Sequence, residues 1–344
     1  MKSTFLNVAF RIILLGLTYT FLIQNEVFSQ SRNFIWGING HAVSKRSPYG
    51  NSLQLQLQQL KQIGFTYYRN DILVDKLGNV SGKERFEELL KSASRYKIKI
   101  LPMIYDSWNA QRSDQENYDL GFMIGYNFTK KYFQYFSAIE IGNEKDEIVI
   151  DKSINNRFGR TADGQLPSHF NTKLINSLAA SLKGMANGIH KANKNTKVII
   201  SCSNHPRWGY FEALKRNNVN FDIVGVHWYT SSGPITNIYG ENGIKMFSQF
   251  KKPIWITEIN RKGGSYGESG TDTEASALLS LVDEIYPYKN VQAFFIYELY
   301  DSPAEKSKGS LEGYFGIFES PKIKKEATEQ LRIAIKNKSK LYKN

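Results

Sequence analysis

Two glutamates stand where short apolar runs end, and a carboxylate there could do acid–base or nucleophilic chemistry. Glu258 ends the run 254–257, whose β-branched and aromatic residues predict a buried strand. Glu144 follows a similar run over 138–142. A glutamate at the end of a buried strand is costly to keep charged unless a site uses it. From the local sequence alone, Glu258 could equally be a surface carboxylate where a strand meets a loop.

The elements that must position these carboxylates alternate regularly along the chain. Apolar runs predict eight strands, over residues 34–39, 65–71, 98–104, 138–142, 197–202, 221–226, 253–257 and 291–297. Helical segments are predicted between and after them, over residues 53–63, 83–96, 119–133, 169–192, 210–216, 244–250, 272–286 and 323–335. A long polar loop is expected over 145–167.

Apolar strands separated by helices indicate a parallel sheet that is covered on both faces. The predicted fold class is therefore α/β, a single (β/α)8 TIM barrel that occupies residues 30–344. The alternative is a doubly wound open sheet. That alternative is disfavoured because no strand is followed by a G-x-G-x-x-G or P-loop sequence.

In such a barrel, the residues just past the carboxyl ends of the strands meet at one mouth, where active sites lie. Polar and aromatic residues occupy these positions: His41, Arg69, Asp71, Tyr105, Asp106, Asn143, Glu144, Asn204, His205, His227, Tyr229, Glu258, Tyr297 and Glu298. Glu144 and Glu258 come from strands four and seven, on opposing parts of the wall. Glu140 alternates with Glu144 along its strand, so it is expected to point into the barrel or into helix packing and to be a poor substitute.

Two facing carboxylates suit the hydrolysis of a glycosidic bond. One must be protonated to donate to the leaving oxygen, and the other must be ionised to attack the anomeric carbon or to activate water. Their surroundings must therefore push their pKa values apart. Arg69 and Tyr229 could hold one glutamate charged, while a neighbouring negative charge and partial burial are expected to raise the pKa of the other.

The sequence resembles clan A of the glycoside hydrolases, the retaining "4/7" barrels. The resemblance rests on Asn143-Glu144 after strand four and Glu258 after strand seven. The triplet 227–229, His-Trp-Tyr, is similar to the H-x-Y of family 5-type cellulases and mannanases, and Arg69 stands where that family has a strand-two arginine. Residues 294–301 and 313–316 resemble the closing segments of such enzymes, including family 39-like members.

The resemblance implies a role for each matching residue. Glu144 would be the general acid/base and Glu258 the nucleophile of a double displacement, with carboxyl groups about 5–5.5 Å apart. Asn143 would bond the sugar 2-hydroxyl, and Tyr229 and Arg69 would orient and stabilise Glu258. The remaining substrate-binding candidates are His227, which would line the site, and Tyr297, Trp108 and Asn204.

Two departures from the clan pattern concern the sugar platform and the residue after the acid/base. Many members have a tryptophan at the end of strand eight, where this chain has Tyr297, and a proline where it has Lys145. Trp108 is equally interpretable as a packing residue, as are Trp208 and Trp228. Glu298 and Glu312 are secondary candidates in loops.

Other functions remain as alternatives to a glycosidase that acts on a β-linked glycan. A catalytically inactive glycan-binding barrel would have no use for two facing glutamates. A metal-dependent hydrolase would need ligands such as His41, His205 and His227, but their spacing matches no known zinc motif. We therefore expect no metal and no cofactor. The net charge of +13 comes without a nucleic-acid motif, so we expect a solvated basic surface and no nucleic-acid partner.

The N-terminal residues 1–29 have the pattern of a secretory signal peptide. Lys2 and Arg11 lie before an apolar run, and Val27-Phe28-Ser29 matches the pattern of a signal-peptidase cleavage site. We therefore expect a secreted protein without stable membrane insertion, an uncleaved anchor being the alternative. Cys202 is the one cysteine, so no internal disulfide is available and a packed thiol is expected. We expect a monomer; the sugar, the linkage, and exo or endo action stay open.

Overall fold

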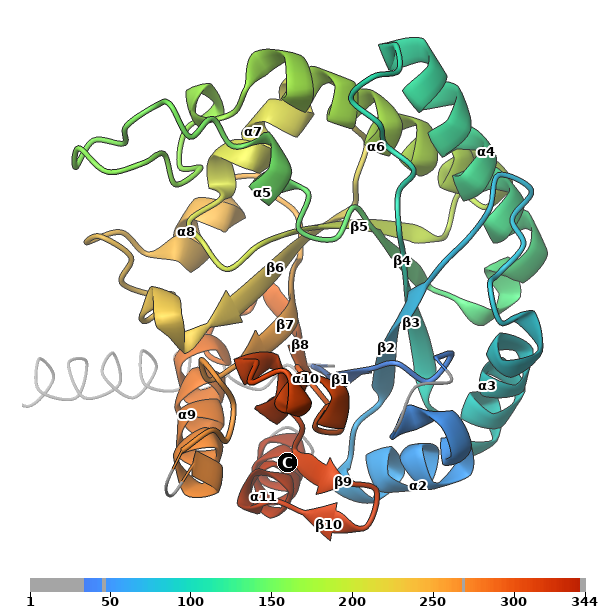
Figure 1. The fold of residues 1–344 in the computed structure, drawn as a ribbon, viewed down its shortest axis with the longest axis vertical. Helices are drawn as coiled ribbons and strands as arrows, with labels where there is room; N and C mark the ends of the chain where they lie inside the picture. Colours follow the sequence, from blue (N-terminus) through green and yellow to red (C-terminus); the bar gives the residue numbers. More distant parts are fainter. Residues whose placement is uncertain (1–33, 45–47, 268–269, 341–344) are drawn as a thin grey trace, which may run out of the picture.

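The predicted strands form a closed parallel barrel in the computed structural model, which describes residues 34–44, 48–267 and 270–340 (Figure 1). Each strand pairs with the next, and β1 pairs with β8 to close the ring. The barrel strands are β1 (Ile35–Gly40), β2 (Tyr67–Ile72), β3 (Lys99–Ile104), β4 (Ala138–Ile141), β5 (Lys197–Cys202), β6 (Ile223–Tyr229), β7 (Ile254–Asn260) and β8 (Val291–Ile296). The predicted (β/α)8 barrel is confirmed.

Helices surround this barrel as an outer layer (Figure 1). The larger ones are α2 (Leu53–Ile63), α3 (Lys83–Tyr96), α4 (Asp114–Tyr132), α6 (Thr172–Ala192), α7 (Trp208–Arg216), α8 (Gly243–Ser248), α9 (Gly270–Ile285) and α11 (Glu326–Lys340). Shorter elements are η1 (Tyr49–Asn51), η2 (Phe133–Tyr135), α5 (Asp146–Val149), η3 (Pro167–His169), η4 (Thr230–Ser232), α10 (Pro303–Ser307), η5 (Leu311–Tyr314), β9 (Phe318–Ser320) and β10 (Ile323–Lys324). The predicted signal segment, 1–29, lies outside the described residues, within which every helix is too short or too polar to cross a lipid bilayer.

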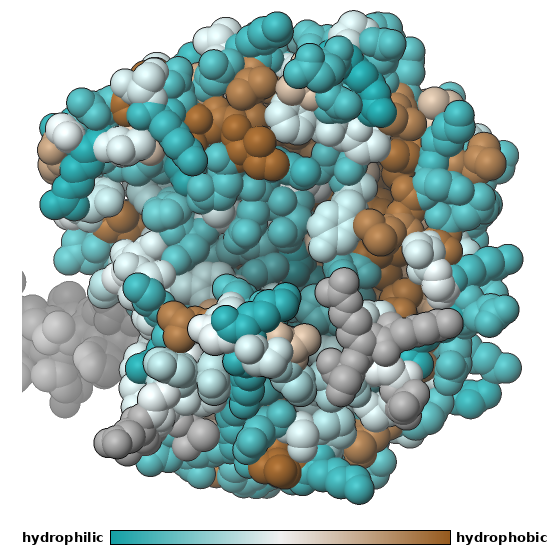
Figure 2. Space-filling view, viewed as in Figure 1, coloured by the Kyte–Doolittle hydropathy of each residue, from teal (hydrophilic) through white to brown (hydrophobic). Residues whose placement is uncertain are grey.

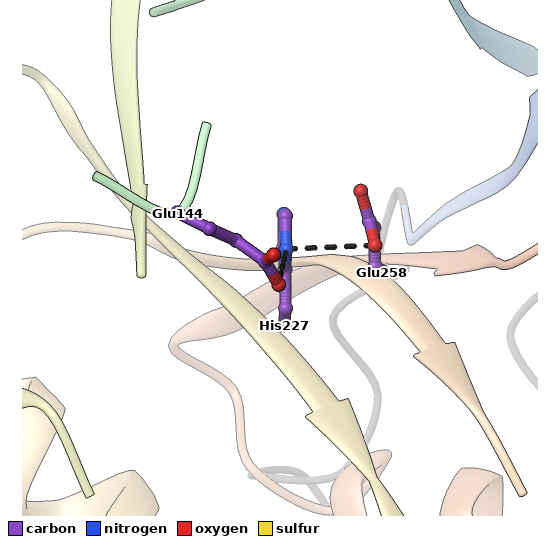
Figure 3. A group of neighbouring side chains, drawn as sticks. All are labelled: Glu144, His227 and Glu258. Atoms are coloured by element: carbon purple, nitrogen blue, oxygen red, sulfur yellow. Dashed lines mark hydrogen bonds and ion pairs between the residues drawn. The ribbon is translucent and has the colours of Figure 1, made fainter. Parts of the chain in front are cut away.

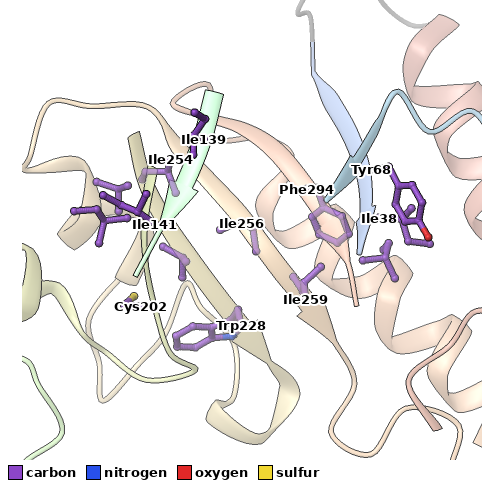
Figure 4. Close-up of a cluster of buried hydrophobic side chains, with 14 of the residues drawn as sticks. Ile38, Tyr68, Ile139, Ile141, Cys202, Trp228, Ile254, Ile256, Ile259 and Phe294 are labelled. Atoms are coloured by element: carbon purple, nitrogen blue, oxygen red, sulfur yellow. The ribbon is translucent and has the colours of Figure 1, made fainter. Parts of the chain in front are cut away.

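The strands carry apolar side chains on both faces, which is why the local sequence predicts them well. On the outer face, residues such as Ile38, Ile139 and Ile256 pack under the helices (Figure 4). A separate cluster fills the barrel interior with strand residues: Tyr67, Leu101, Ala138, Ile199, Ile223, Trp255, Ala293 and Phe295. Cys202 is buried and unpaired on the outer face, as expected for a packed thiol.

Above this apolar interior layer the barrel becomes polar. Side chains on one face of a strand recur every second residue, so Arg69 follows Tyr67 and Glu140 follows Ala138 on the inner face. Both polar side chains are buried. The interior therefore contains a charged layer toward the carboxyl ends of the strands.

Helices α4 and α6 approach closely because glycines face each other across their contact. A Cβ atom on Gly125 would lie 2.3 Å from the carbonyl oxygen of Met185, and one on Gly184 would lie 2.1 Å from that of Tyr118. Both distances are far below van der Waals contact. This packing fixes α6 against the outside of the barrel next to β4, where Leu182 lies against Gly142.

Strands six and seven are longer than the sequence predicts. The predicted ends are residues 226 and 257, but β6 continues to Tyr229 and β7 to Asn260. The added residues pair across the two strands, His227 with Glu258 and Tyr229 with Asn260. The apolar pattern stops early because the inner faces of these extensions hold site residues. His227 and Glu258 thus lie within strands rather than in loops.

Several helix boundaries also differ from prediction, among them the starts of α4 and α11. Helix α4 begins at Asp114 because Ser113 and Glu116 form a capping box, in which each side chain accepts from the other's backbone N–H. The last helix begins at Glu326 rather than 323, since Ile323 pairs with Ser320 in the β9–β10 hairpin.

Candidate active site

Glu144, His227 and Glu258 meet at the mouth of the barrel, with the imidazole between the two carboxyl groups (Figure 3). His227 Nδ1 lies 2.8 Å from Glu144 Oε1 and 3.5 Å from Glu258 Oε2. One oxygen of each glutamate and a ring nitrogen of His227 all lie within 4.8 Å of one another. The two glutamates, which are far apart in the sequence, are thus brought together as predicted.

Glu258 is held by two donors, one from β2 across the barrel and one from the adjacent strand β6. Arg69 Nη1 donates to its Oε1 at 2.7 Å, and the hydroxyl of Tyr229 donates to its Oε2 at 2.9 Å. The residue is only 8% exposed, so these two contacts replace most of the water that a carboxylate would otherwise bind. The arrangement therefore fixes both carboxyl oxygens of Glu258 in position.

Arg69 connects four strands of the barrel through its guanidinium. It forms a bidentate pair with Glu140, with Nε to Oε2 at 2.7 Å and Nη2 to Oε1 at 2.8 Å, and it also donates to Asn39 and Asn143. Burial opposes the charge of Arg69, but Glu140 and Glu258 outweigh it and raise the arginine pKa. Burial likewise opposes the charge of Glu140, yet Arg69 and His227 hold the pKa of Glu140 below its usual range.

From the sequence alone, no site role is expected for Glu140 or Asn39. Glu140 is fully buried in the barrel interior, in line with the expected direction of its side chain. Its bidentate pair with Arg69 was not foreseen. A signal existed: Asn39 is in register with Arg69, and both belong to the alternating inner face of their strands.

His227 is fully buried and is surrounded by carboxylates. Its Nε2 lies 3.6 Å from Glu140 Oε1, on the side opposite its bond to Glu144. Burial acts to lower the pKa of His227, but Glu258, Glu140 and Glu144 together raise it to about 10. His227 is therefore an imidazolium at neutral pH.

This cation reverses the pKa shift expected for the second glutamate. The sequence analysis expects a neighbouring negative charge and burial to raise the pKa of the acid/base residue. Burial does act in that direction on Glu144, but the hydrogen bond and positive charge of His227 outweigh it and lower its pKa. The expectation is wrong because the group in direct contact with Glu144 is a cation.

Glu144 lies on a tight turn that follows β4. The backbone angle φ is +68° at Gly142 and +48° at Glu144, both in the left-handed region. Glycine adopts this region freely, whereas a glutamate there must be held by its surroundings. A side chain at position 142 would also meet Leu182 at 2.7 Å. The turn lifts the Glu144 carboxyl out of the strand toward His227.

The other predicted substrate contacts gather around a hollow of about 380 Å³. Asn143, Asn204 and Tyr297 line it together with Glu144, Tyr229 and Glu258. The Asn204 side chain accepts from the backbone N–H of Tyr229 at 2.7 Å and donates to Ser231 at 2.8 Å. Tyr297 contacts the Tyr229 ring edge-on, at 6.3 Å between centroids.

Trp108 is not brought to this hollow. Its indole nitrogen donates to Ser177 at 3.1 Å, and its ring packs against the apolar core outside the barrel. Trp228 is fully buried in the same core and donates to the carbonyl of Gly233. The structure thus supports the packing interpretation of both tryptophans, and a sugar contact for Trp108 stays a prediction.

The three histidines of the alternative zinc hypothesis bind different carboxylates. His41 Nδ1 contacts Asp71 at 2.7 Å, its Nε2 lies 3.4 Å from Glu298, and His205 lies 4.0 Å from Glu147. Their separate partners give no support to a site that they share. Glu144, His227 and Glu258 have ligand atoms close enough for a metal ion, which would have to displace the proton of His227.

The closed barrel and the paired glutamates at its mouth define the class of protein, a clan A (β/α)8 glycoside hydrolase. The sequence model of glycosyl hydrolase family 53 matches residues 103–306, which is more than half of the chain. The chain belongs to this family. The predicted clan is thereby confirmed, and family 53 is the member family that matches. No curated protein matches the sequence.

Solved structures with the same fold include several glycosidases. The exo-β-1,4-mannosidase Op5Man5 from Opitutaceae bacterium strain TAV5 is 14% identical with a TM-score of 0.63, over 90% of this chain and 60% of that one. The β-D-glucuronidase of Dictyoglomus thermophilum is 14% identical with a TM-score of 0.61, over 88% and 50%. The family 1 β-glucosidase of Thermotoga maritima is 13% identical with a TM-score of 0.62, over 89% and 99%. The chain therefore spans 60% and 50% of the first two proteins, and at these identities the likeness concerns the fold.

Proposed function

We propose that this protein is a secreted retaining glycoside hydrolase that cleaves β-linked glycans by double displacement. One observation carries the proposal: oxygens of Glu144 and Glu258 approach within 4.8 Å across the mouth of a glycosidase barrel. Retaining enzymes place their carboxyl groups about 5–5.5 Å apart, whereas inverting enzymes leave about 6.5–9.5 Å for a water molecule. Secretion rests on the signal-like pattern of residues 1–29.

In the first step, Glu258 attacks the anomeric carbon while the bond to the leaving sugar breaks. Arg69 and Tyr229 donate to the attacking carboxylate and keep it aligned. Glu144 donates its proton to the leaving oxygen, so the first sugar leaves neutral and the second stays as a glycosyl ester on Glu258. In the second step, Glu144 takes a proton from water, which attacks the anomeric carbon and releases Glu258 as a carboxylate.

His227 connects the protonation states of these two residues. Glu144 must be protonated in the first step, but the imidazolium in contact with it lowers its pKa. The protonated form of Glu144 that the first step needs therefore becomes more populated as the pH falls.

The shape of the cleft favours an extended substrate. The catalytic hollow shares Tyr297 and Glu312 with a second hollow of about 630 Å³. That hollow shares Leu73, Ser81 and Tyr105 with a third of about 420 Å³. Figure 2 shows a depression in the centre of this face lined mainly by hydrophilic side chains. We infer that several linked sugars bind at once and that the chain is cut internally.

The charge of the second hollow favours a glycan without carboxylates. Among the residues that the structure describes, four acidic side chains line it, Asp71, Glu298, Glu305 and Glu312, together with the imidazole of His41. A uronate there would be repelled at close range, although the chain as a whole carries a net charge of +13. The basic surface is therefore a poor guide to the substrate.

Replacement of Glu258 by alanine tests the proposed mechanism. Turnover should fall by roughly 10⁴-fold or more, because no other group forms the glycosyl ester. Azide or formate should restore cleavage of an activated aryl β-glycoside and give a product of inverted configuration. Glu84→Ala, which removes an exposed glutamate, is the matched control and should keep wild-type activity. Normal turnover by Glu258→Ala would remove the nucleophile assignment.

Product analysis with the wild-type protein tests the proposed substrate. Neutral and uronate-bearing β-linked polysaccharides would be digested side by side, and the products followed by mass spectrometry and NMR. Internal cleavage of a neutral chain with retained configuration is expected. Binding of glycans without any hydrolysis would instead support the inactive glycan-binding barrel.

A further inference from the structure

The turn that carries Glu144 leads directly into α5, a helix of a single turn. The left-handed backbone of Glu144, with φ of +48°, is a conformation that a non-glycine residue keeps only when its surroundings enforce it. The backbone N–H of Glu147 donates back to the carbonyl of Glu144 at 3.2 Å. A helix this short has little stability of its own, so its position must come from tertiary contacts.

Arg207 supplies the main contacts of this kind. Its Nε lies 2.9 Å from Asp146 Oδ2, and its Nη2 donates to Glu147 Oε1 at 2.7 Å. Ser203 reinforces the junction, with its backbone N–H donating to Asp146 Oδ1 at 3.0 Å and its hydroxyl donating to Oδ2 at 2.5 Å. These contacts tie α5 to the segment between β5 and α7.

Burial makes this junction rigid. Arg207 is 3% exposed and Asp146 is fully buried, so neither charge has water as an alternative partner. Removing one partner of such a pair leaves the other charge uncompensated, which is far more costly than at the surface. A second tie, from Lys145 to Asp106 at 3.2 Å, holds the same turn from the side of β3.

Arg207 has no contact with the reacting groups themselves. It is not among the residues that line the three hollows, and its ion pairs go to Asp146 and Glu147 rather than to Glu144 or Glu258. Glu258 is held instead by Arg69 and Tyr229. Arg207 thus acts on the helix that follows Glu144 and not on Glu258, and His227 is the group that contacts both glutamates.

We propose that Arg207 is a positioning residue for the general acid/base: by fixing Asp146 and Glu147 it places the Glu144 carboxyl against the leaving oxygen. The inference rests on the proposed role of Glu144. Arg207 acts on protonation of the leaving group and leaves nucleophilic attack by Glu258 unaffected. Loss of Arg207 therefore slows the cleavage of a substrate more strongly when its leaving group depends more on protonation.

The test compares two leaving groups in a set of variants. Values of kcat/KM would be measured for an unactivated phenyl and an activated 2,4-dinitrophenyl β-glycoside of the sugar that the wild-type protein releases. Arg207→Gln should lose roughly 10–100-fold on the phenyl glycoside and less than about threefold on the activated one. Arg207→Lys keeps a positive charge but cannot contact Asp146 and Glu147 together as the guanidinium does. Its loss of kcat/KM should be intermediate, and again larger on the phenyl glycoside than on the activated one.

Two further variants separate the possible outcomes. Glu144→Ala should show the strongest dependence on the leaving group; if it shows none, the proposed acid/base role fails and the role of Arg207 fails with it. Arg216→Gln removes an exposed arginine of α7 that pairs with Glu212 at 2.9 Å, and should behave as wild type. If Glu144→Ala behaves as expected, equal losses on both glycosides in the Arg207 variants would show a merely structural role and overturn the inference. If Arg207→Gln does not fold, Arg207→Lys decides by the same criterion.

Discussion

His227 contacts both glutamates of the proposed mechanism, and its charge therefore acts directly on the site. It lies 2.8 Å from Glu144 and 3.5 Å from Glu258, with Glu140 on its other side. Three carboxylates around one buried imidazole raise the imidazole pKa to about 10, even though burial acts against it. The same contact lowers the pKa of Glu144.

Replacement of His227 by glutamine should move the pH dependence of catalysis upward. An amide can still donate to Glu144 but carries no charge, so the pKa of Glu144 should rise. Since Glu144 must be protonated to act, the alkaline limb of kcat/KM should shift to higher pH while the maximum falls. A pH profile with a substrate that has a poor leaving group would measure this.

The matched control is His190→Gln, because His190 also pairs with a carboxylate, Asp222 at 2.8 Å, but on the outside of the barrel. Its profile should be that of the wild type. An alkaline limb that stays in place or moves downward in His227→Gln would contradict the assignment of that limb to Glu144.

At the scale of elements, the contact between α4 and α6 supports the Glu144 turn from outside the barrel. The close approach of these helices depends on glycines, and Leu182 of α6 lies directly under Gly142. A change that separates the helices would therefore displace Leu182, on which the turn packs. Stability and catalysis are linked through this one contact.

Gly184→Ala should destabilise the protein, by about 1–3 kcal/mol. Alanine normally favours a helix over glycine by about 1 kcal/mol. Here its Cβ would lie 2.1 Å from the backbone carbonyl of Tyr118, which cannot move without displacing α4, so the steric cost should prevail. Denaturant unfolding would measure the change. Lys173→Ala on the exposed side of α6 is the control, and a more stable Gly184→Ala would disprove this account of the packing.

At the scale of the whole molecule, a buried charged cluster joins the last strands of the barrel to two helices. Lys325 Nζ lies 2.6 Å from Asp301 Oδ1 and 3.6 Å from Glu274 Oε2, and Asn260 donates to Glu274 Oε1 at 3.1 Å. One lysine thus serves two carboxylates. Burial, and then the nearby charge of Asp301, raise the pKa of Glu274 to about 8 against the pull of Lys325.

This cluster predicts a loss of stability at alkaline pH. Glu274 holds its proton in the folded state up to about pH 8, whereas its ordinary pKa is 4.5. The folded state then binds more protons than the unfolded state between these values, so the contribution is complete below pH 4.5 and is lost as the pH rises through 8. Glu274→Gln should remove this dependence. The unfolding free energy of the variant, relative to that of the wild type, should therefore increase by on the order of 1–3 kcal/mol between pH 5 and 9.

Unfolding free energies at several pH values would test this difference. Glu329→Gln, which removes an exposed carboxylate of α11, should keep the wild-type pH dependence. Parallel curves for Glu274→Gln and the wild type would mean that Glu274 is not the group responsible.

The sequence by itself determined the order of the elements and the identity of the two glutamates. Helix α3 and strand β5 have the predicted bounds, and Gly64 ends α2 in the left-handed conformation expected of a C-terminal glycine. These features depend on neighbours within one element, where periodicity and backbone preference act directly. Glu144 and Glu258 were identifiable because each follows a buried apolar run.

Only the tertiary structure decided how the site is charged and supported. The bidentate pair of Arg69 and Glu140, the cationic state of His227 and the hold of Arg207 on α5 join residues from different strands and loops. No local pattern encodes such pairs, because they form only when barrel closure and strand register bring the residues into contact. The same reason explains the early predicted ends of β6 and β7: polar residues that face a site interrupt the apolar pattern, while the backbone ladder continues.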